Sequence, residues 1–401
     1  MARHGDQAEP GFRRFWGRPG RRPVPESGTH EPGLASDGVS VCLAILARNE
    51  AGTLPRLAQS VRPHIQQWLV IDTGSTDGTA AVARREFAGI PGEVVERPWV
   101  DFGHNRTEML SLVPSSATHV LILDADMTLE CDAPLGTLLG DVPGDRFLVR
   151  ITEPGLEYRL PLLLRTGVPW RYVGATHEYL DCDEPTMSIK VNFLSIVHHA
   201  DGRVRGEKLT RDLDLLMEEI QRNPGNARTM FYLGQTLAGL GDWRAAVGWY
   251  TRCAEISTWN EEIYVALCSM GELHMVHNEI DEAMVAYTRA TELGLGRPEA
   301  FYRLAQMANH GGDHEAARMW AEAGLVRKTN SDALFLEPWT RTWGLPYEWA
   351  IAAWSTGDAA AARSMFASLA DAALPPEPFL SACRTNATRP LPGDEARAPS
   401  N

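Results

Sequence analysis

The sequence predicts an α/β domain followed by an all-α domain of helical repeats, and three observations lead to this prediction. Before about residue 205, short continuous apolar runs alternate with helix-like stretches, a pattern typical of buried parallel strands in an α/β sheet. After that point the sequence becomes helical and self-similar. A chain of 401 residues is also too long for one ordinary core and suits two.

The first part of the chain has a strand-turn-helix rhythm. Residues 54–61 and 79–87 have a helix-like composition, and the second stretch follows the turn-forming sequence Gly-Ser-Thr-Asp-Gly at 74–78. The apolar runs that we expect to form strands are 39–46, 68–71, 92–95 and 119–123.

The second part contains a recurring turn-plus-helix phrase. Its four copies lie at 241–246, 278–283, 312–317 and 357–362, and their final alanines, Ala246, Ala283, Ala317 and Ala362, are 37, 34 and 45 residues apart. A period near 34, with small residues where helices would cross, resembles the tetratricopeptide pattern of stacked helical hairpins. The long last interval predicts an irregular final unit.

Composition limits the classes of protein to which the chain can belong. A formal net charge of -14 argues against a nucleic-acid binder. No apolar run approaches the roughly 18 residues that cross a bilayer, and the first residues lack the apolar core of a secretion signal. We therefore expect a cytoplasmic protein whose six scattered cysteines are reduced.

The expected organisation has four segments. Stretches rich in Pro, Gly, Ala and charge at both ends predict disordered tails. The segments are a tail at 1–38, the α/β domain at 39–205, the helical domain at 206–383 and a tail at 384–401.

The turn after the second expected strand carries the most specific local signal. Its sequence places Asp72 at the carboxyl end of a buried strand, where α/β folds bind nucleotides. A carboxylate there can accept hydrogen bonds from a base or a ribose hydroxyl. The alternative is structural, with Ser75 or Asp77 capping the next helix.

A second pair of acids follows the fourth expected strand. Asp124 and Asp126 lie one residue apart and would repel each other unless a cation or a proton intervened. Oxygen ligands suit Mg²⁺ or Mn²⁺, and such an ion would offset the charge of a diphosphate leaving group. Alone, an Asp-x-Asp pattern is weak evidence, because it is common in acidic loops.

These segments together resemble family-2 glycosyltransferases with a GT-A fold, a Rossmann-like nucleotide-sugar domain. The opening run at 41–50 is similar to the first strand of that family, and the two acidic segments are similar to its nucleotide-binding turn and metal-binding motif. Further similarity lies at 101–106, 170–178 and 197–199. Thr73 stands where many members have a second Asp, and this departure weakens the assignment of uracil as the base.

The resemblance implies roles for particular residues. The nucleoside pocket and donor would be contacted by Ala47, Asn49, Glu50, Asp72, Arg106 and Asp124, and the metal would be bound by Asp126.

Candidate catalytic and additional metal residues lie in the last part of the α/β domain. An inverting displacement at an anomeric carbon needs a base for the acceptor proton, and we assign this role to Glu178, with His177 orienting the acceptor. Glu178 could instead pair with Arg171 or serve as a carboxylate at the start of a helix. His198 and His199 are candidate metal ligands, and packing is their alternative role.

The expected function is transfer of a sugar from a nucleoside diphosphate sugar, UDP-sugar by resemblance, to an acceptor nucleophile. The order of transferase and repeats is similar to the sublancin-type S-glycosyltransferase subgroup, which implies a peptide acceptor and a homodimer formed through the helices. Proteins, small metabolites and cell-surface glycans remain open as acceptors. The alternatives are a non-catalytic repeat scaffold with a degenerate transferase domain and a nucleotidyltransferase, whose Gly-rich, lysine-bearing phosphate loop is not visible in the sequence.

Overall fold

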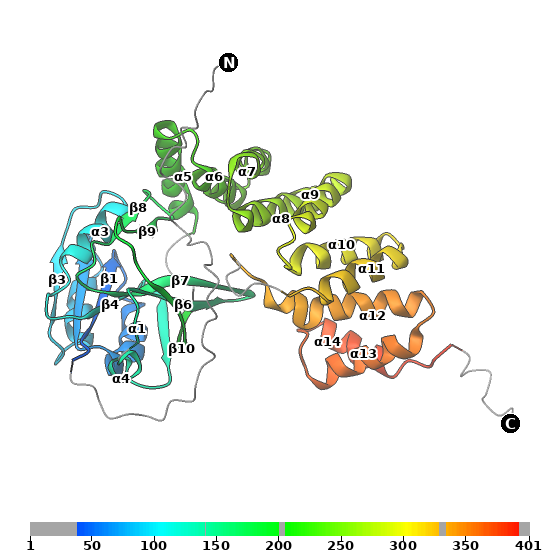
Figure 1. Ribbon diagram of the computed structural model, residues 1–401, viewed down its shortest axis with the longest axis horizontal. Coiled ribbons are helices and arrows are strands. Elements are labelled where there is room, and N and C mark those ends of the chain that lie inside the picture. The colour runs from blue at the N-terminus through cyan, green and yellow to red at the C-terminus, as the bar shows by residue number, and fades with distance from the viewer. Residues whose placement is uncertain (1–37, 141, 200–204, 329–333, 393–401) are drawn as a thin grey trace, which may run out of the picture.

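The computed structural model describes residues 38–140, 142–199, 205–328 and 334–392. It contains a sheet domain and a helical domain that leads away from it (Figure 1). Nearly all of the tail expected at 1–38 lies outside the described residues, as does 393–401. The last helix ends at Ala387, so helical structure continues beyond the expected boundary at 383.

An eight-stranded mixed sheet forms the first domain. Its strands, in the order in which they pair, are β3 (Gly92–Glu96), β2 (Gln67–Asp72), β1 (Val41–Ala47), β4 (His119–Ile122), β7 (Leu156–Arg165), β6 (Arg146–Glu153), β10 (Ser188–His198) and β5 (Met127–Cys131). The four strands expected from the sequence are confirmed and parallel to one another. The remaining strands make the sheet mixed, since β7 and β5 pair antiparallel with their neighbours.

Strand β1 shows why its sequence is a continuous apolar run. Val41, Leu43 and Ile45 face one side of the sheet, while Cys42 and Ala44 face the other, and all five are fully buried. Since side chains alternate between the faces of a strand, a strand covered on both sides needs apolar residues at every position.

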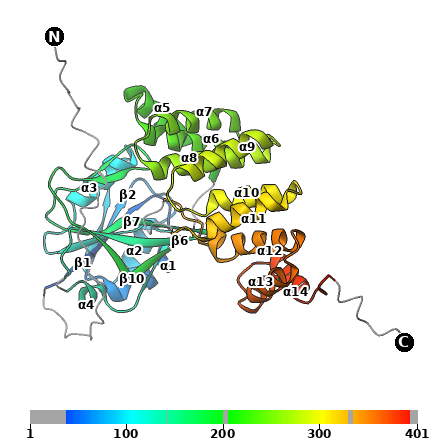
Figure 2. The ribbon, with the colours of Figure 1, turned by 45° about the vertical axis from the view of Figure 1, so that its right-hand side comes forward.

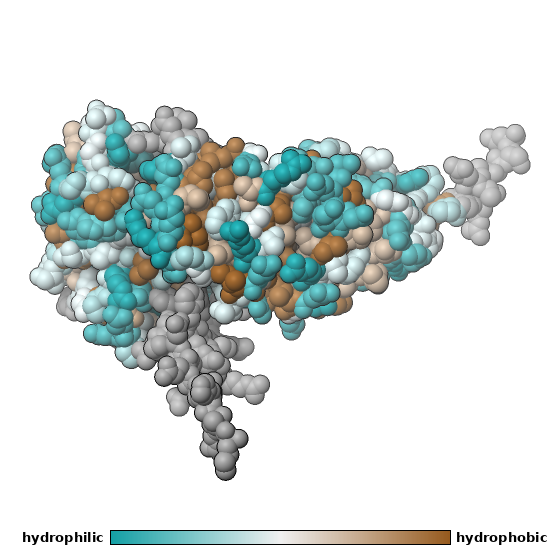
Figure 3. Space-filling view, turned by 90° about the horizontal axis from the view of Figure 1, so that it is seen from above, coloured by the Kyte–Doolittle hydropathy of each residue, from teal (hydrophilic) through white to brown (hydrophobic). Residues whose placement is uncertain are grey.

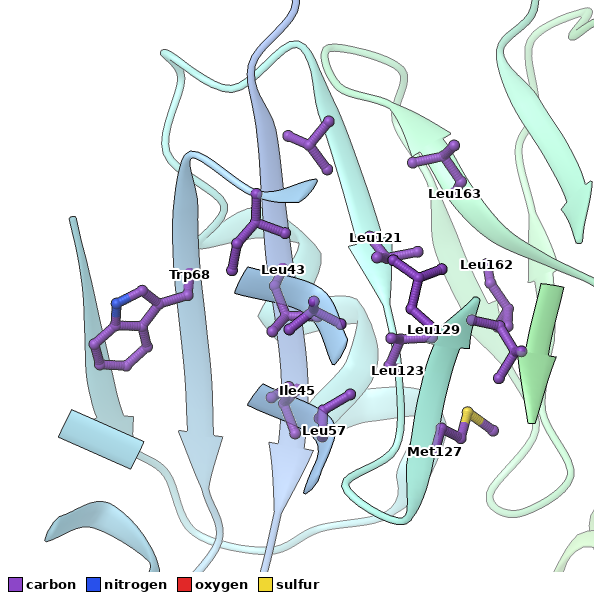
Figure 4. Close-up of a cluster of buried hydrophobic side chains, with 14 of the residues drawn as sticks. Leu43, Ile45, Leu57, Trp68, Leu121, Leu123, Met127, Leu129, Leu162 and Leu163 are labelled. Atoms are coloured by element: carbon purple, nitrogen blue, oxygen red, sulfur yellow. The ribbon is translucent and has the colours of Figure 1, made fainter. Parts of the chain in front are cut away.

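Helices cover both faces of the sheet. On one face lie α1 (Leu54–Val61), α2 (Thr79–Glu86) and the short α4 (Leu135–Leu139), which pack onto the core drawn in Figure 4. On the other lies α3 (Phe102–Ser111), next to the two-stranded ribbon of β8 (Arg171–Val173) and β9 (Tyr179–Asp181). The helices expected at 54–61 and 79–87 are thereby confirmed.

Consecutive helices pack against one another in the second domain (Figure 2). They are α5 (Arg205–Arg222), α6 (Ala227–Leu240), α7 (Trp243–Ile256), α8 (Asn260–Val276), α9 (Ile280–Glu292), α10 (Glu299–His310), α11 (His314–Leu325), α12 (Leu345–Ser355), α13 (Ala359–Asp371) and α14 (Phe379–Ala387). A single π-helical stretch, η2 (Thr340–Gly344), precedes α12 and accounts for part of the long last interval.

The recurring phrase marks the second helix of each hairpin. It opens α7, α9, α11 and α13, and the final alanine of every copy is fully buried. Glycine serves the same close packing: a Cβ added to Gly271 would lie 2.6 Å from the ring of Tyr287, and one added to Gly234 would lie 2.7 Å from Tyr250. The self-similarity therefore reports helix contacts that admit only small residues.

All six cysteines are free thiols. Cys42, Cys253 and Cys383 are buried, and burial raises the pKa of the Cys42 thiol to about 12. These cysteines serve as small core residues.

Candidate functional site

The polar residues of the candidate site gather because six strands end at the same edge of the sheet. Strands β1 to β4 are parallel, and β6 and β10 run in the same direction, since β7 between β4 and β6 is antiparallel to both. Asp72, Glu153 and His198 are the last residues of three of these strands. They therefore share one edge with Asp124, which follows β4.

The loop after β1 is joined to the turn after β2. Asn49, whose φ is 57°, accepts a hydrogen bond at Oδ1 from the Thr76 amide (2.6 Å), and its own amide donates to Ser75 Oγ (2.8 Å). The Glu50 amide donates to Thr79 Oγ1 (2.7 Å). Asn49 and Glu50 thus hold the two loops together, whatever else they contact.

Asp72 has a structural function in its turn. It is buried, and its Oδ1 accepts hydrogen bonds from the amides of Gly74 (3.0 Å) and Ser75 (2.7 Å). Its other oxygen has no hydrogen bond from the described residues and remains available to a ligand. Ala47 is buried, and its carbonyl accepts the Thr73 amide.

Asp77 fulfils the structural alternative at the start of α2. Its Oδ1 accepts hydrogen bonds from the Thr79 amide (3.0 Å) and hydroxyl (2.5 Å). Both carboxylates of the motif thus stabilise the turn.

Arg106 of α3 connects two of the expected site residues. Its Nη2 donates to Asp124 Oδ1 (2.6 Å), and its Nε lies 3.0 Å from Glu178 Oε1 in an ionic contact without hydrogen-bond geometry. The guanidinium also lies over the Tyr172 ring, 5.7 Å from its centroid. Burial opposes the charge, but the carboxylates of Asp124 and Glu178 outweigh burial and raise the pKa of Arg106 above its usual range.

A second cluster holds Asp126. His198 lies between two carboxylates, with Nε2 3.2 Å from Asp126 Oδ2 and Nδ1 2.8 Å from Glu153 Oε1. Hydrogen bonds to Asp126 and Glu153 raise the pKa of His198 to about 10, so the ring carries a positive charge at neutral pH. Burial opposes ionisation of Asp126, but contact with His198 outweighs burial and lowers the pKa of that carboxyl.

The described residues supply only part of a metal site. They contain no group of three His, Cys, Asp or Glu side chains arranged to hold an ion. The His199 amide donates to the Asp126 carbonyl (3.1 Å), but the His199 ring faces Thr128, with Nε2 2.9 Å from Thr128 Oγ1. Asp126 and His198 are close enough to be two ligands of one ion if His198 gives up a proton, and other ligands would have to come from a substrate or water.

His177 and Glu178 lie where the sheet domain meets the helical domain. The His177 ring stacks on Tyr232 of α6 with centroids 3.9 Å apart and ring planes within 4°. Its carbonyl accepts hydrogen bonds from Arg228 of α6, from Nη2 (3.0 Å) and Nε (3.2 Å). Burial, together with the charges of Lys208 and Arg228, lowers the pKa of His177 to about 3, so the ring is neutral and serves packing.

Glu178 does not pair with Arg171, which was its alternative partner. Arg171 instead pairs with Asp181 and, at 2.8 Å, with Asp183. Glu178 faces Arg106, and its side chain is 8% exposed. The backbone of the preceding residue is fixed by α6, so the helical domain determines where Glu178 lies.

Sequence reasoning missed several residues of this site. Glu153, Tyr172 and Tyr232 contact expected residues, and Tyr158 contacts Glu153. Tyr172 lies in the segment 170–178 that carries the resemblance but was given no role there, and Glu153 and Tyr158 belong to no motif that the sequence analysis identified. Glu153 meets His198 only because β6 and β10 are neighbours in the sheet. Only that pairing could have identified it.

Comparisons with known proteins bear on the helical region. The family model described as tetratricopeptide repeat matches residues 268–333. A TPR repeat-containing protein of Synechococcus elongatus is 29% identical over 238 residues, covering 54% of this chain and 56% of the relative. The chain thus spans about half the length of that relative.

Several solved structures are similar to part of the chain. The TPR protein YrrB, whose structure is described as having an unusual peptide-binding site, is 15% identical, covers 44% of this chain and 81% of its own, and has a TM-score of 0.35. MamA is 16% identical over 47% of this chain and 91% of its own, with a TM-score of 0.34. The helical region contains tetratricopeptide repeats, and none of the described helices is long and apolar enough to cross a membrane.

Proposed function

We propose that the sheet domain transfers a sugar from a nucleoside diphosphate sugar to a nucleophile presented at the helical domain. One observation carries this proposal: two clusters of charged residues gather at one edge of the sheet. Arg106 contacts Asp124 and Glu178 in the first, and His198 contacts Asp126 in the second. In α/β folds, this edge is where nucleotides bind.

The chemistry expected of the first cluster is a displacement with inversion. Glu178 would accept the acceptor proton as the acceptor atom bonds to the anomeric carbon and the bond from that carbon to the diphosphate oxygen breaks. Arg106 places a fixed positive charge in the same cluster, where it can stabilise negative charge on the leaving group. UDP is the nucleotide that the resemblance favours.

A divalent cation fits the second cluster in part. Asp126 and a deprotonated His198 would hold Mg²⁺ or Mn²⁺, with phosphate oxygens and water completing a shell of about six ligands. Such an ion would offset the charge of the departing diphosphate.

The helical domain is proposed to bind the acceptor as a peptide or protein. Stacked repeats form extended surfaces suited to such partners. Hydrophobic and hydrophilic residues are interspersed on the face drawn in Figure 3. Large apolar side chains exposed on the repeats include Ile280, Met284, Val285, Met319 and Val326.

The second candidate function is a protein-binding scaffold without catalysis. The comparisons favour this function over a transferase, because the matching family model covers repeat residues 268–333 and the matched relative is described as a TPR repeat-containing protein. Protein cations also already partner the two acids of the Asp-x-Asp pattern. A binding experiment distinguishes the two.

The test is thermal unfolding with nucleoside diphosphates, with and without Mn²⁺. A ligand present at about 100 times its Kd stabilises the folded state by about 2.7 kcal/mol. We expect UDP with Mn²⁺ to raise the Tm of the wild type and of Asp281→Ala, which changes an exposed acid of α9, but not that of Asp126→Ala. A wild type that responds to no nucleotide would support the scaffold.

Glu178→Gln tests the base. Donor binding should persist, while release of UDP from the donor, with water as acceptor, should fall by about 10²- to 10⁴-fold. Unchanged turnover would remove Glu178 from this role.

A further inference from the structure

A short segment of the helical domain is clamped by buried charges. This segment, 334–337, is here called the strap. Arg297, whose side chain is 2% exposed, donates from Nη1 to the Leu334 carbonyl (2.7 Å) and from Nη2 to the Phe335 carbonyl (3.1 Å). Glu299 Oε1 accepts the amide of Glu337 (3.0 Å). The strap is therefore fixed to the repeats at both of its ends.

The strap also contacts the sheet domain, reaching the hairpin of β6 and β7 that extends towards the helices (Figure 1). Leu336 and Glu157 of β7 exchange two backbone hydrogen bonds, of 2.9 and 3.0 Å. The Phe335 ring meets the Tyr158 ring edge to face, with centroids 5.5 Å apart.

Phe335 has a φ of 49°, in the left-handed region. This conformation is unfavourable for a bulky residue, so the surrounding contacts hold the ring where it is.

Tyr158 continues this path to the candidate site. Its hydroxyl donates to Glu153 Oε1 (2.5 Å), and the same oxygen lies 2.8 Å from His198 Nδ1. The other ring nitrogen of His198 faces Asp126 at 3.2 Å. Each contact fixes the orientation of the next side chain.

We propose that Phe335 and Tyr158 are positioning residues, through which the helical repeats set the orientation of His198 and Asp126. The functional consequence, control of Mn²⁺-nucleotide binding by the strap, rests on the proposed function. A partner that displaces the strap would change the orientation of the Asp126 carboxylate without contacting Asp126. The two domains are thus coupled at this contact as well as at His177.

Two substitutions separate this coupling from folding. Tyr158→Phe keeps the ring and removes only the hydroxyl, while Phe335→Gly removes the ring at a φ that glycine adopts freely. Tyr347→Phe is the matched control, because the ring of Tyr347 in α12 packs against Phe366 and Phe379 in a separate hydrophobic cluster.

The first measurement needs no ligand. In a ¹H–¹⁵N correlation spectrum of the histidine rings of the full chain, we assign the His198 signals by their loss in His198→Gln. Tyr158→Phe and Phe335→Gly should shift them, and Tyr347→Phe should not. Unshifted His198 signals in Phe335→Gly would overturn the inference that the strap positions this ring, whatever Tyr158→Phe shows.

The second measurement tests the consequence. Partners beyond the direct ligands typically change metal affinity by about 10- to 100-fold, and we expect Tyr158→Phe to weaken Mn²⁺-dependent UDP binding by about 10-fold while binding of UDP alone is unchanged. We expect Phe335→Gly to weaken this binding as well, and wild-type affinity in Phe335→Gly would refute control of the site by the strap. If the wild type itself binds no nucleotide, the proposed function fails, and the ring spectrum still decides whether the strap positions His198.

Discussion

Acidification should weaken the junction between the two domains through His177. Its pKa is lowered from the model-peptide value of 6.5 to about 3 by burial and nearby positive charge. Because the unfolded chain binds a proton at this ring below pH 6.5 and the folded protein does not, stability falls as the pH drops from 6.5 towards 3. At pH 5, which is 1.5 units below 6.5, the free energy of unfolding is lower by about 2 kcal/mol, since each pH unit contributes about 1.36 kcal/mol.

The variant that isolates this loss is His177→Phe. Phenylalanine can retain the stack on Tyr232, which lies 3.9 Å away, but it cannot be protonated. The free energy of unfolding is measured in urea at pH 8, 7, 6 and 5. The difference in this free energy between variant and wild type should be the same at pH 8 and pH 7. Towards pH 5 the difference should move by about 2 kcal/mol in favour of the variant. Parallel losses in both proteins between pH 7 and 5 would refute a buried neutral ring.

Substitutions at three further positions test the repeats. Gly271→Ala should cost about 1–3 kcal/mol in urea unfolding, because the added Cβ would lie 2.6 Å from Tyr287; Gly248→Ala, in open space within α7, should instead stabilise by about 0.5–1 kcal/mol. Equal effects at both glycines would contradict the tight helix crossing. Asp313→Ala should cost about 1 kcal/mol, since its side chain caps α11, and Asp313→Asn should recover most of that loss. Failure of the Asn variant to do so would argue against a hydrogen-bonding cap.

The sequence predicted the strands and helices whose formation depends on residues close together in the chain. The apolar run expected to form a strand at 39–46 and the helix expected at 54–61 depend on residues close in sequence, and the structure has β1 at Val41–Ala47 and α1 at Leu54–Val61. The repeat phrase was equally informative, because a buried alanine such as Ala283 reports a helix crossing within one hairpin. The antiparallel strands β7 and β5 were not predicted, since nothing near them in sequence specifies their partners.

The candidate site was predictable only residue by residue. Asp72 and Asp126 stand at strand ends, which the sequence indicates. Their partners come from distant segments: Glu153 lies 45 residues from His198, the ring that it contacts, and Tyr232 reaches His177 from another domain. Such contacts depend on strand order and on domain packing.

The Asp-x-Asp pattern shows how a sound electrostatic argument can leave the identity of the cation open. Two acids one residue apart do need positive charge, and the expectation was a divalent ion bound by Asp126, with Asp124 contacting the donor. Asp124 instead meets the guanidinium of Arg106 (2.6 Å), and Asp126 meets the imidazolium of His198 (3.2 Å). Each acid thus has its own cation from a different element, and their mutual repulsion is already offset. A metal at this edge therefore has to compete with side chains of the protein, so metal dependence must be measured and does not follow from the motif.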